Sequence, residues 1–310
     1  MKALVATDYG SFDNLKFAEI EKPVPGEGEI LVKTRAVSVN PVDWKIVTGQ
    51  RQGSFPAVFP YVVGWDLSGI VEDRGHAARR FNVGDKVYGY IRRPQLKDGT
   101  YSEYVLVPEC YLCKAPDKIS LKDASAIPLA GLTAYQALTV FGHLHRGETI
   151  MILGASGGVG TLAVQISKIM GAKIIAIASA SNLDFLKNIG ADYCFDYNDA
   201  TWVEKVTEIS PDLVLDCAGG ETRDKGVPAV SKEGRVVSLT AREFPDKTIN
   251  FTGMLVEPHS LNLELLTSWI EQGKLKPFVS KYFKFDHAIE ALKLNQEGKT
   301  RGKIVVTIGD

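Results

Sequence analysis

The chain has 310 residues, of which 45% are hydrophobic and 24% charged, so it is long enough for about two domains and resembles an ordinary globular protein in composition. Lys and Arg number 36 against 37 Asp and Glu, and the formal charge of −1 disfavours a nucleic acid or an anionic membrane as the main partner. The N-terminus lacks a secretory signal, no apolar run approaches membrane-spanning length, and four cysteines do not build a disulfide framework, so we expect a cytoplasmic protein.

Short apolar runs dominate the first third of the chain. Each run alternates in the manner of a half-buried strand, and turns such as 25–28 and Gly84-Asp85 separate them. This spacing predicts a partly closed, mainly antiparallel β domain rather than βαβ units. The strands are expected at residues 2–6, 29–37, 69–72, 86–90 and 101–107.

The pattern changes near residue 119, where two short helices within 121–138 lead to an apolar strand at 149–153 and then to a glycine-rich turn. Glycines remove the Cβ atoms that would keep a pyrophosphate from the backbone, so N–H groups and the helix dipole can hold the anion. The dinucleotide fingerprint fits registers that start at Ala155 or at Gly158, and we favour the first. Alternatively, the turn is a hairpin or helix cap without a ligand. Cofactor contacts are predicted for Ser156, Gly157, Gly158 and Val159.

The segment after this turn completes a βαβ unit. Apolar residues recur at helical spacing over 159–169, Gly171 ends that helix, and 173–178 is a continuous apolar run typical of a parallel strand covered on both faces. Helices and strands then alternate, which predicts a doubly wound parallel sheet. The helices are expected at 183–189 and 223–230, and the strands at 192–195, 212–216 and 235–239.

The last segment holds two helices and two strands, expected at 261–273, 282–285, 287–294 and 303–308. The final strand is expected to return to the first domain. We therefore expect a β-rich catalytic domain made of residues 1–120 and 259–310, with a dinucleotide-binding domain of residues 121–258 between its two parts.

Seven motifs occur in the order seen in the medium-chain dehydrogenase/reductase superfamily, and together they cover nearly the whole chain. The chain resembles the zinc-free, quinone oxidoreductase-like branch. The resemblance implies an α/β protein with a GroES-like catalytic domain beside a Rossmann domain, an active site in the cleft between them, and a homodimer paired through an edge strand within 248–256. The motifs are Asn40-Pro-Val-Asp43, Gly64-Trp-Asp66, Gly84-Asp-Lys-Val87, Leu129-Ala-Gly-Leu-Thr-Ala134, Gly154-Ala-Ser-Gly-Gly-Val-Gly160, Gly190-Ala-Asp192 and Arg301-Gly-Lys-Ile-Val305.

The zinc ligands of the alcohol dehydrogenase branch correspond by this resemblance to Asn40, Trp65 and Leu129, none of which is a normal zinc ligand. The lobe with four closely spaced cysteines is also missing, so we predict no metal. Cys110 and Cys113 have the spacing of half a zinc site or of a redox pair. Alternatively, they are two small apolar residues in a strand and its approach.

The expected nicotinamide cofactor is NADP(H). Selectivity for NAD needs a carboxylate about 20 residues beyond the glycines, and here the segment 178–183 carries none. Ser179, together with Ser181, can donate to a 2′-phosphate; alternatively, the serines cap the next helix, and the two roles are compatible. By resemblance, Asn182 and Tyr197 complete this pocket, although Asn182 supplies a hydrogen bond without a charge.

Four further cofactor contacts are predicted. By family analogy Thr133 contacts the nicotinamide, although it can equally be a helix-packing residue. Cys217, Ala218 and Leu239 follow two strands at their carboxyl ends, where open α/β sheets bind ligands.

By resemblance the substrate is a quinone or an α,β-unsaturated carbonyl, whose oxygen can take the negative charge that hydride transfer creates. Asn40 is the first choice for a catalytic polar group, or alternatively it caps the loop before Pro41. Asp43 is expected to fix that loop, and Trp65 to wall the pocket or simply to belong to the core. The sequence suggests no proton donor, so solvent or a ribose hydroxyl would serve.

Two other functions compete with this zinc-independent reductase. A zinc-dependent alcohol dehydrogenase is opposed by the residues at the three ligand positions. The second alternative is a non-catalytic sensor or scaffold protein that binds NADP(H). A ruined glycine turn or a blocked cleft would favour this alternative, and the sequence shows neither.

Overall fold

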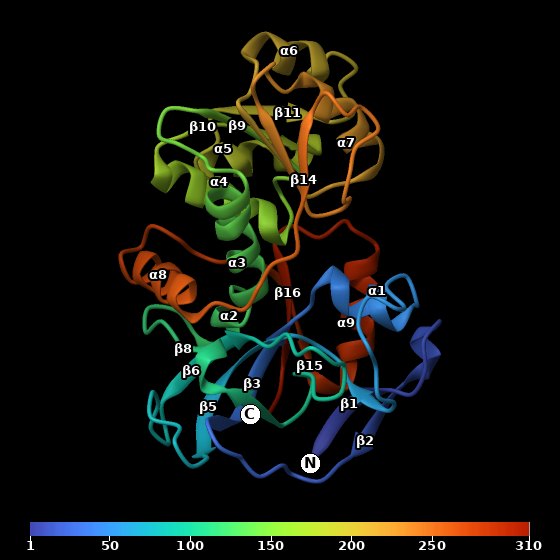
Figure 1. The fold of residues 1–310 in the computed structure, drawn as a ribbon, viewed down its shortest axis with the longest axis vertical. Helices are drawn as coiled ribbons and strands as arrows, with labels where there is room; N and C mark the ends of the chain where they lie inside the picture. The colour runs from blue at the N-terminus through green and yellow to red at the C-terminus, as the bar shows by residue number, and fades with distance from the viewer. Residues whose placement is uncertain (310) are drawn as a thin grey trace. The chain divides into compact units, whose positions relative to one another are not determined.

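The computed structural model describes residues 1–309 and divides into two compact units (Figure 1). The first unit comprises Met1–Leu129, Pro258–Gln272 and the segment from Pro277 onward, and the second comprises Ala130–Glu257 with Gly273–Lys276. Compared with the boundaries expected above, residues 121–129 lie in the first unit, where the short helix α2 (Leu121–Ala124) packs on four strands of the larger sheet of that unit. Residues 273–276 lie in the second.

The first unit is built on two sheets. Strands β1 (Lys2–Ala6), β2 (Leu15–Glu19) and β4 (Tyr61–Val62) form a small antiparallel sheet in the order β2-β1-β4. The larger sheet has the order β15-β16-β3-β5-β6-β8, with β7 also paired to β3, and its pairs are antiparallel except β15 with β16. Its strands are β3 (Glu29–Ser38), β5 (Asp66–Arg74), β6 (Lys86–Tyr90), β7 (Tyr104–Pro108), β8 (Leu112–Lys114), β15 (Val279–Lys284) and β16 (Lys303–Thr307).

The last strand of the chain lies beside one of the first. Val305 and Val306 of β16 pair with Ser38 and Val37 of β3 in an antiparallel register. Because β3 ends at Ser38, this pairing brings Lys303, at the start of β16, to the loop that carries Asn40. Residues far apart in the sequence therefore meet at the end of β3.

Helices complete the first unit, and one of them, α1 (Pro41–Val47), is absent from the sequence-based expectations. It begins where Pro41 supplies a preset φ at the first helical position, and Asp43 in its first turn accepts a hydrogen bond from the Asn40 N–H. The others are α8 (Ser260–Glu271), α9 (Ala288–Gln296) and the short turns Phe12–Asn14, Glu109–Tyr111 and Phe285–His287.

The second unit is a parallel six-stranded sheet in the order β11-β10-β9-β12-β13-β14, which confirms the predicted doubly wound fold (Figure 1). The chain runs outward from the central β9 to β10 on one side and later to β12 on the other. The topological switch point, where the strand order reverses, therefore lies between β9 and β12. The strands are β9 (Thr149–Leu153), β10 (Lys173–Ala178), β11 (Tyr193–Asp196), β12 (Leu213–Asp216), β13 (Arg235–Ser238) and β14 (Asn250–Gly253).

The helices of this unit follow the expected alternation with two differences. Helix α6 (Trp202–Ile209) was not expected, and it buries Trp202 in the core of the unit. Helix α7 covers Gly220–Gly226 and gives way to a 3-10 turn, because Pro228 lacks the N–H that would continue it. The others are α3 (Pro128–Gln136) with the π-helical turn Ala137–Phe141, α4 (Gly158–Met170), the 3-10 turn Ala180–Asn182 and α5 (Leu183–Ile189).

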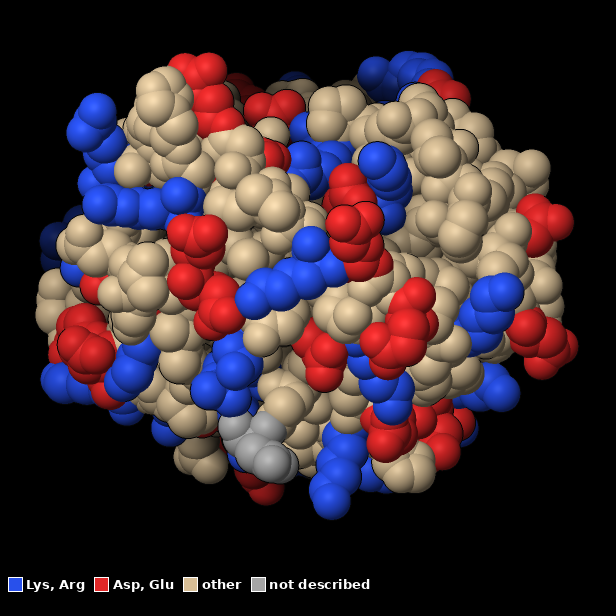
Figure 2. All heavy atoms as spheres, turned by 90° about the horizontal axis from the view of Figure 1, so that it is seen from below, with Lys and Arg blue, Asp and Glu red and all other residues tan. Residues whose placement is uncertain are grey.

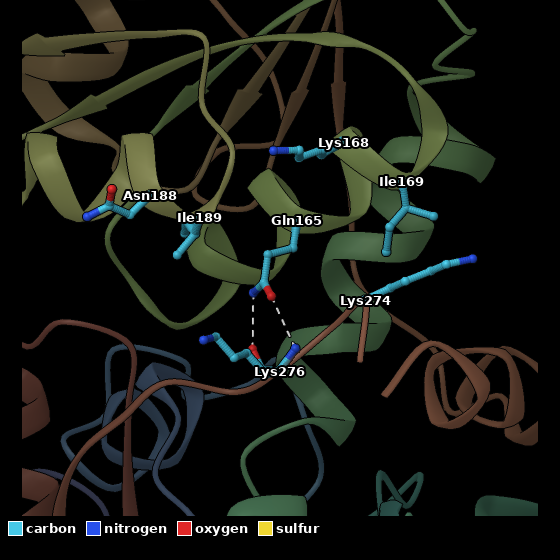
Figure 3. A pocket seen from close by; sticks show the side chains of 7 residues that line it. All are labelled: Gln165, Lys168, Ile169, Asn188, Ile189, Lys274 and Lys276. Atoms are coloured by element: carbon cyan, nitrogen blue, oxygen red, sulfur yellow. Dashed lines mark hydrogen bonds between the residues drawn. The ribbon is translucent and has the colours of Figure 1, made fainter. Parts of the chain in front are cut away.

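A returning segment of the chain is held on α4 by one side chain. Gln165 donates from Nε2 to the Lys276 carbonyl at 3.0 Å and accepts from the Lys276 N–H at 3.1 Å, as Figure 3 shows. Beside this contact is a cavity of about 430 Å³. It lies on the later half of α4 and the end of α5, away from the carboxyl edge of the sheet where these helices begin. Its lining residues are Gln165, Lys168, Ile169, Asn188, Ile189, Lys274 and Lys276.

The surface in Figure 2 carries basic and acidic side chains interspersed over one face, in keeping with the near-neutral formal charge. Among residues 1–309, no helix is both long and apolar enough to cross a membrane.

Candidate active site

The glycine turn joins β9 to α4 at the carboxyl edge of the parallel sheet. Gly154 has φ +76°, and the Gly157 N–H donates to the Gly154 carbonyl at 3.1 Å, which closes the turn before α4 begins at Gly158. A Cβ on Gly160 would lie 2.4 Å from the Gly154 carbonyl oxygen, so α4 could not pack as closely against the turn that precedes it. A Cβ on Gly157 would meet only that oxygen, at 3.4 Å. The open backbone at Gly157 thus lies at the start of a helix of 13 residues.

The residues predicted to bind a 2′-phosphate gather at the end of β10. Ser179 precedes a 3-10 turn, its hydroxyl accepts from Asn182 Nδ2 at 2.8 Å and lies 3.3 Å from the Ser181 hydroxyl. Tyr197 follows β11, its N–H donates to the Ala178 carbonyl, and its side chain is 44% exposed. The Ser179 hydroxyl makes no helix-capping bond. These residues form one polar group with no positive charge of their own.

A buried carboxylate, which the sequence analysis did not single out, organises two loops beside the turn. Asp216 ends β12 and is fully buried; its Oδ1 accepts from the N–H groups of Ala218 and Gly219. Its Oδ2 accepts from the Ser238 hydroxyl of β13 at 2.6 Å. A single side chain therefore fixes the loops that follow two neighbouring strands.

The predicted contacts that follow β12 and β13 lie on these loops. Ala218 packs next to the glycine turn, since a Cβ added to Gly154 would lie 3.4 Å from the Cβ of Ala218. Cys217 donates its N–H to the Leu153 carbonyl, and Leu239 donates its N–H to the Asp216 carbonyl. Thr133 lies on α3 and is buried.

The first unit contains a second polar cluster, centred on the buried carboxylate of Asp66. Asp66 Oδ2 accepts from the Ser38 hydroxyl at 2.6 Å and from Asn40 Nδ2 at 2.8 Å. Its Oδ1 accepts from the Leu129 N–H at 2.7 Å, and Lys303 Nζ lies 3.8 Å from Oδ2. Burial raises the pKa of Asp66, while Lys303 and these donors lower it.

Asn40 is 1% exposed and its amide is fully engaged within this cluster. Nδ2 donates to Asp66 and to the Ser38 carbonyl, while Oδ1 accepts from Lys303 Nζ at 2.5 Å. Both amide hydrogens are therefore already used inside the protein. Asn40 also precedes α1, where its main-chain carbonyl accepts from the Asp43 N–H at 3.0 Å.

Asp43, on the first turn of α1, is 2% exposed. Its Oδ2 accepts from the Asn40 N–H at 2.8 Å, as expected of a residue that holds this loop. Its Oδ1 is buried without a hydrogen-bond partner. The pKa of Asp43 is raised to about 8, mainly by burial; the Asn40 N–H and Lys303 lower it and the nearby Asp66 raises it within that net value.

Aromatic rings adjoin the Asp66 cluster. Trp65 is buried, packs edge-on against Phe55 with ring centroids 5.0 Å apart, and tilts over Tyr90 at 5.9 Å. Tyr90 lies directly opposite Asp66 in the β5–β6 ladder. An aromatic wall of this kind suits a flat, conjugated ligand.

The three positions expected by resemblance to correspond to the zinc ligands of the alcohol dehydrogenase branch lie around the same carboxylate. The Asn40 side chain and the Leu129 N–H both donate to Asp66, and Trp65 precedes it in the chain. An engaged amide, an indole and an aliphatic side chain are not a zinc-binding set. Across residues 1–309, no cluster of three or more His, Cys, Asp or Glu could hold a metal.

The CxxC segment supplies two separate free thiols. Cys113 is buried in β8 with Sγ 3.5 Å from the Thr267 hydroxyl, whereas Cys110 is exposed. Burial raises the pKa of Cys113 to about 11, which disfavours the thiolate.

Comparisons with known proteins identify the family of this chain. Residues 26–117 match the alcohol dehydrogenase GroES-like domain, and residues 189–306 match a zinc-binding dehydrogenase family. The chain is 31% identical to a chloroplast envelope quinone oxidoreductase homolog of Arabidopsis thaliana, over 99% of this chain and 98% of the relative. It is 35% identical to a 2-methylene-furan-3-one reductase of Solanum lycopersicum, over 99% of this chain and 79% of the relative.

A quinone oxidoreductase from Coxiella burnetii has a similar structure, with a TM-score of 0.91, 29% identity and coverage of 100% of this chain and 99% of the other. These findings define an oxidoreductase that uses a nicotinamide cofactor and acts on a small molecule. Within that class, the chain belongs to the medium-chain dehydrogenase/reductase superfamily, in its quinone oxidoreductase-like branch. The family and the two-domain fold expected from the seven motifs are thereby confirmed.

Proposed function

We propose that the protein transfers a hydride from NADPH to a quinone or an α,β-unsaturated carbonyl without a metal. The observation that carries the proposal is the composition of the Asp66 cluster: Asn40, Trp65 and Leu129 correspond by resemblance to the zinc-ligand positions of the alcohol dehydrogenase branch, and none is a normal zinc ligand. A simple alcohol needs a Lewis acid to be activated, whereas a conjugated acceptor can take the charge onto its own oxygen.

Residues of the second unit would hold the cofactor, which supplies the hydride when bound. In the proposal, the N–H groups of the turn from Ser156 to Val159 bind the pyrophosphate at the start of α4. Ser179, Asn182 and Tyr197 receive the 2′-phosphate by hydrogen bonds alone. Since none of the three is a cation, we expect NADPH to be preferred over NADH only modestly.

The names of relatives support the substrate class. Besides the two quoted above, an NADPH-dependent alkenal/one oxidoreductase of Arabidopsis thaliana is 34% identical over 99% of this chain and 79% of its own length. In this chain, Phe55 is the less buried ring of the pair that it forms with Trp65 beside Asp66, and it would contact the flat ring or enone.

The experiment follows NADPH oxidation in the presence of quinones, alkenals, enones and simple aldehydes, with and without a chelator. We expect turnover of conjugated acceptors that the chelator leaves unchanged. Alcohol oxidation that the chelator abolishes would instead identify a zinc-dependent alcohol dehydrogenase. Tight NADPH binding without oxidation by any acceptor would identify a sensor or scaffold protein.

We also propose that the protein is a homodimer and works in a reducing cytosol. Strand β14 is the last strand of its sheet, with β13 as its neighbour, so its other edge can pair with a second copy. The four cysteines, all free, fit a reducing compartment. Light scattering during size-exclusion chromatography tests the dimer; a monomeric mass at all concentrations would contradict it.

A further inference from the structure

The Asp66 cluster holds more negative charge than its surroundings balance. Asp43, Asp66 and Lys303 are each at most 5% exposed, so two carboxyls share one buried ammonium. A buried charge is tolerated when it is paired and hydrogen-bonded and is otherwise removed by a proton. One of the two carboxyls is therefore expected to be neutral.

The hydrogen bonds identify which one. Asp66 accepts three hydrogen bonds and faces Lys303, so its charge is compensated. Asp43 accepts only the Asn40 N–H, on Oδ2, and its Oδ1 is unpartnered. The raised pKa of Asp43, about 8, agrees with a carboxyl that carries its proton at neutral pH.

Two tyrosine hydroxyls belong to the same surroundings. The hydroxyls of Tyr61 and Tyr101 are buried without a hydrogen-bond partner, like Asp43 Oδ1. Tyr101 packs against Gly64, two residues before Asp66, since a Cβ there would lie 2.1 Å from its ring. Burial raises the pKa of both tyrosines, and Asp43 raises it further only when it is ionised, which places both hydroxyls near that carboxyl. Leaving a buried polar group without a hydrogen-bond partner is destabilising, so a polar ligand atom would stabilise these groups.

We propose that Asp43 is the proton donor of the reductase reaction proposed above and that Tyr101 helps to receive the substrate oxygen. The inference rests on that proposed function and goes beyond it, because it assigns a source for the proton that hydride transfer leaves outstanding. Asn40 has no amide hydrogen left for this task, whereas Asp43 Oδ1 has no partner inside the protein.

When the substrate is an α,β-unsaturated ketone, its β-carbon accepts the hydride, with its electron pair, from the reduced nicotinamide, and the electrons of the carbon–carbon double bond shift to give an enolate. The Oδ1–H bond of Asp43 then breaks, its proton forms the new bond at the α-carbon, and the electron pair stays on the carboxylate. A proton from water restores Asp43, so the net reaction consumes one NADPH and one proton.

The first test measures the protonation state without relying on turnover. Infrared difference spectra of the intact protein, recorded well below and well above pH 8, detect a protonated carboxyl by its C=O stretch. We expect a band in the wild type that is lost as the pH rises through about 8 and is absent from Asp43→Asn. Asp123→Asn is the matched control, because Asp123 occupies the same first-turn position in α2. No such band, or one that persists in Asp43→Asn, would overturn the inference.

The second test uses NADPH and pent-3-en-2-one as the probe. The wild-type kcat should fall as the pH rises through about 8, and Asp43→Asn should lower kcat by about 10²–10⁴-fold and flatten this profile. NADPH affinity, followed by fluorescence, should be unchanged. Lys45→Met is a needed comparison, since Lys45 also lies on α1 and burial lowers its pKa. The kcat of the Lys45→Met variant should still fall as the pH rises through about 8. If the fall of kcat above pH 8 disappears in Lys45→Met but remains in Asp43→Asn, the proposal is overturned.

Two results separate this inference from the reductase proposal itself. Wild-type protein that binds NADPH but reduces no quinone or enone refutes the reductase function and the donor role with it. Wild-type turnover whose kcat does not fall above pH 8 refutes the donor role alone, even if Asp43→Asn fails to fold. Tyr101→Phe should raise the KM for the ketone at nearly constant stability; an unchanged KM would remove Tyr101 from the site.

Discussion

Single residues decide whether the glycine turn is a fold element or a binding element. Gly160 and Gly157 belong to the same fingerprint, but their surroundings differ. The Cβ position of Gly160 is filled by the backbone of Gly154 and Ala155, whereas that of Gly157 is open apart from one oxygen at 3.4 Å. Replacing them one at a time therefore separates packing from ligand access.

We expect Gly160→Ala to lower the free energy of unfolding by about 1–3 kcal/mol, as overpacking does. Gly157→Ala should leave the melting temperature nearly unchanged and weaken NADPH binding, because its methyl group occupies the side open to the phosphate. Thermal unfolding and fluorescence titration measure the two effects. Equal NADPH affinity in Gly157→Ala and the wild type would argue against phosphate binding at this turn.

Lys303 is the cation that compensates the buried carboxylates of the first unit. Lys303→Met keeps the aliphatic stem but leaves Asp66 charged and unpaired, which should cost about 3–5 kcal/mol of unfolding free energy. The loss of unfolding free energy in Lys303→Met should grow as the pH rises, because the carboxyls ionise and a charged carboxylate needs the cation that a protonated one does not. Lys299→Met, at an exposed position of the same segment, is the control in denaturant unfolding. A loss no larger than that of the control would show that the cation is not required.

The pH dependence of stability should carry the signature of Asp43. Its pKa is raised from 3.8 to about 8 in the folded state, so between these values the folded protein holds a proton that the unfolded chain releases. Its contribution is present in full below pH 3.8 and is lost as the pH rises through about 8. Wild type should therefore lose stability relative to Asp43→Asn over this range, as melting curves would show. A constant difference would contradict a neutral Asp43.

At the scale of elements, the carboxyl edge of the parallel sheet is held by Asp216 rather than by the residues predicted to touch the cofactor. Asp216 joins the end of β12 to the loop after β13 through Ser238, and it fixes the N–H groups of Ala218 and Gly219. The position of Cys217, Ala218 and Leu239 thus depends on a side chain that faces into the protein.

Asp216→Ala should leave several buried groups unpaired, at about 1–3 kcal/mol for each, and should weaken NADPH binding as well. Asp212→Ala is the matched control: Asp212 precedes the same strand at its amino end, where it accepts the Thr149 N–H. It should reduce stability while leaving NADPH affinity unchanged. If both variants weaken binding equally, Asp216 has no special role in placing these loops.

Over the whole molecule, both units depend on the last part of the chain. Strand β16 pairs with β3 in the first unit, and Lys276 is held by Gln165 in the second. A chain that ends at residue 272 lacks both, although it keeps the complete glycine turn. Neither unit of the chain is continuous in sequence.

We expect that truncated chain to be unfolded or aggregated, with loss of the cooperative melting transition and of NADPH binding. Gln165→Leu in the full-length chain is the milder comparison, which should lower stability while the protein stays folded, because it removes two hydrogen bonds to Lys276. A cooperatively folded truncated chain that binds NADPH would show that the second unit is independent of residues 273–276.

The sequence by itself determined the fold class, the glycine turn and the family, because helical and strand periodicities and glycine spacing are local properties that short segments express. Helix α5 lies where it was expected, while α1, β2 and α6 were not anticipated and α7 begins earlier. Only the tertiary structure decided what Asn40, Asp43 and Asp66 do. Their protonation and hydrogen bonds depend on burial and on Lys303, a residue 263 positions from Asn40, and such proximity arises only when β16 pairs with β3.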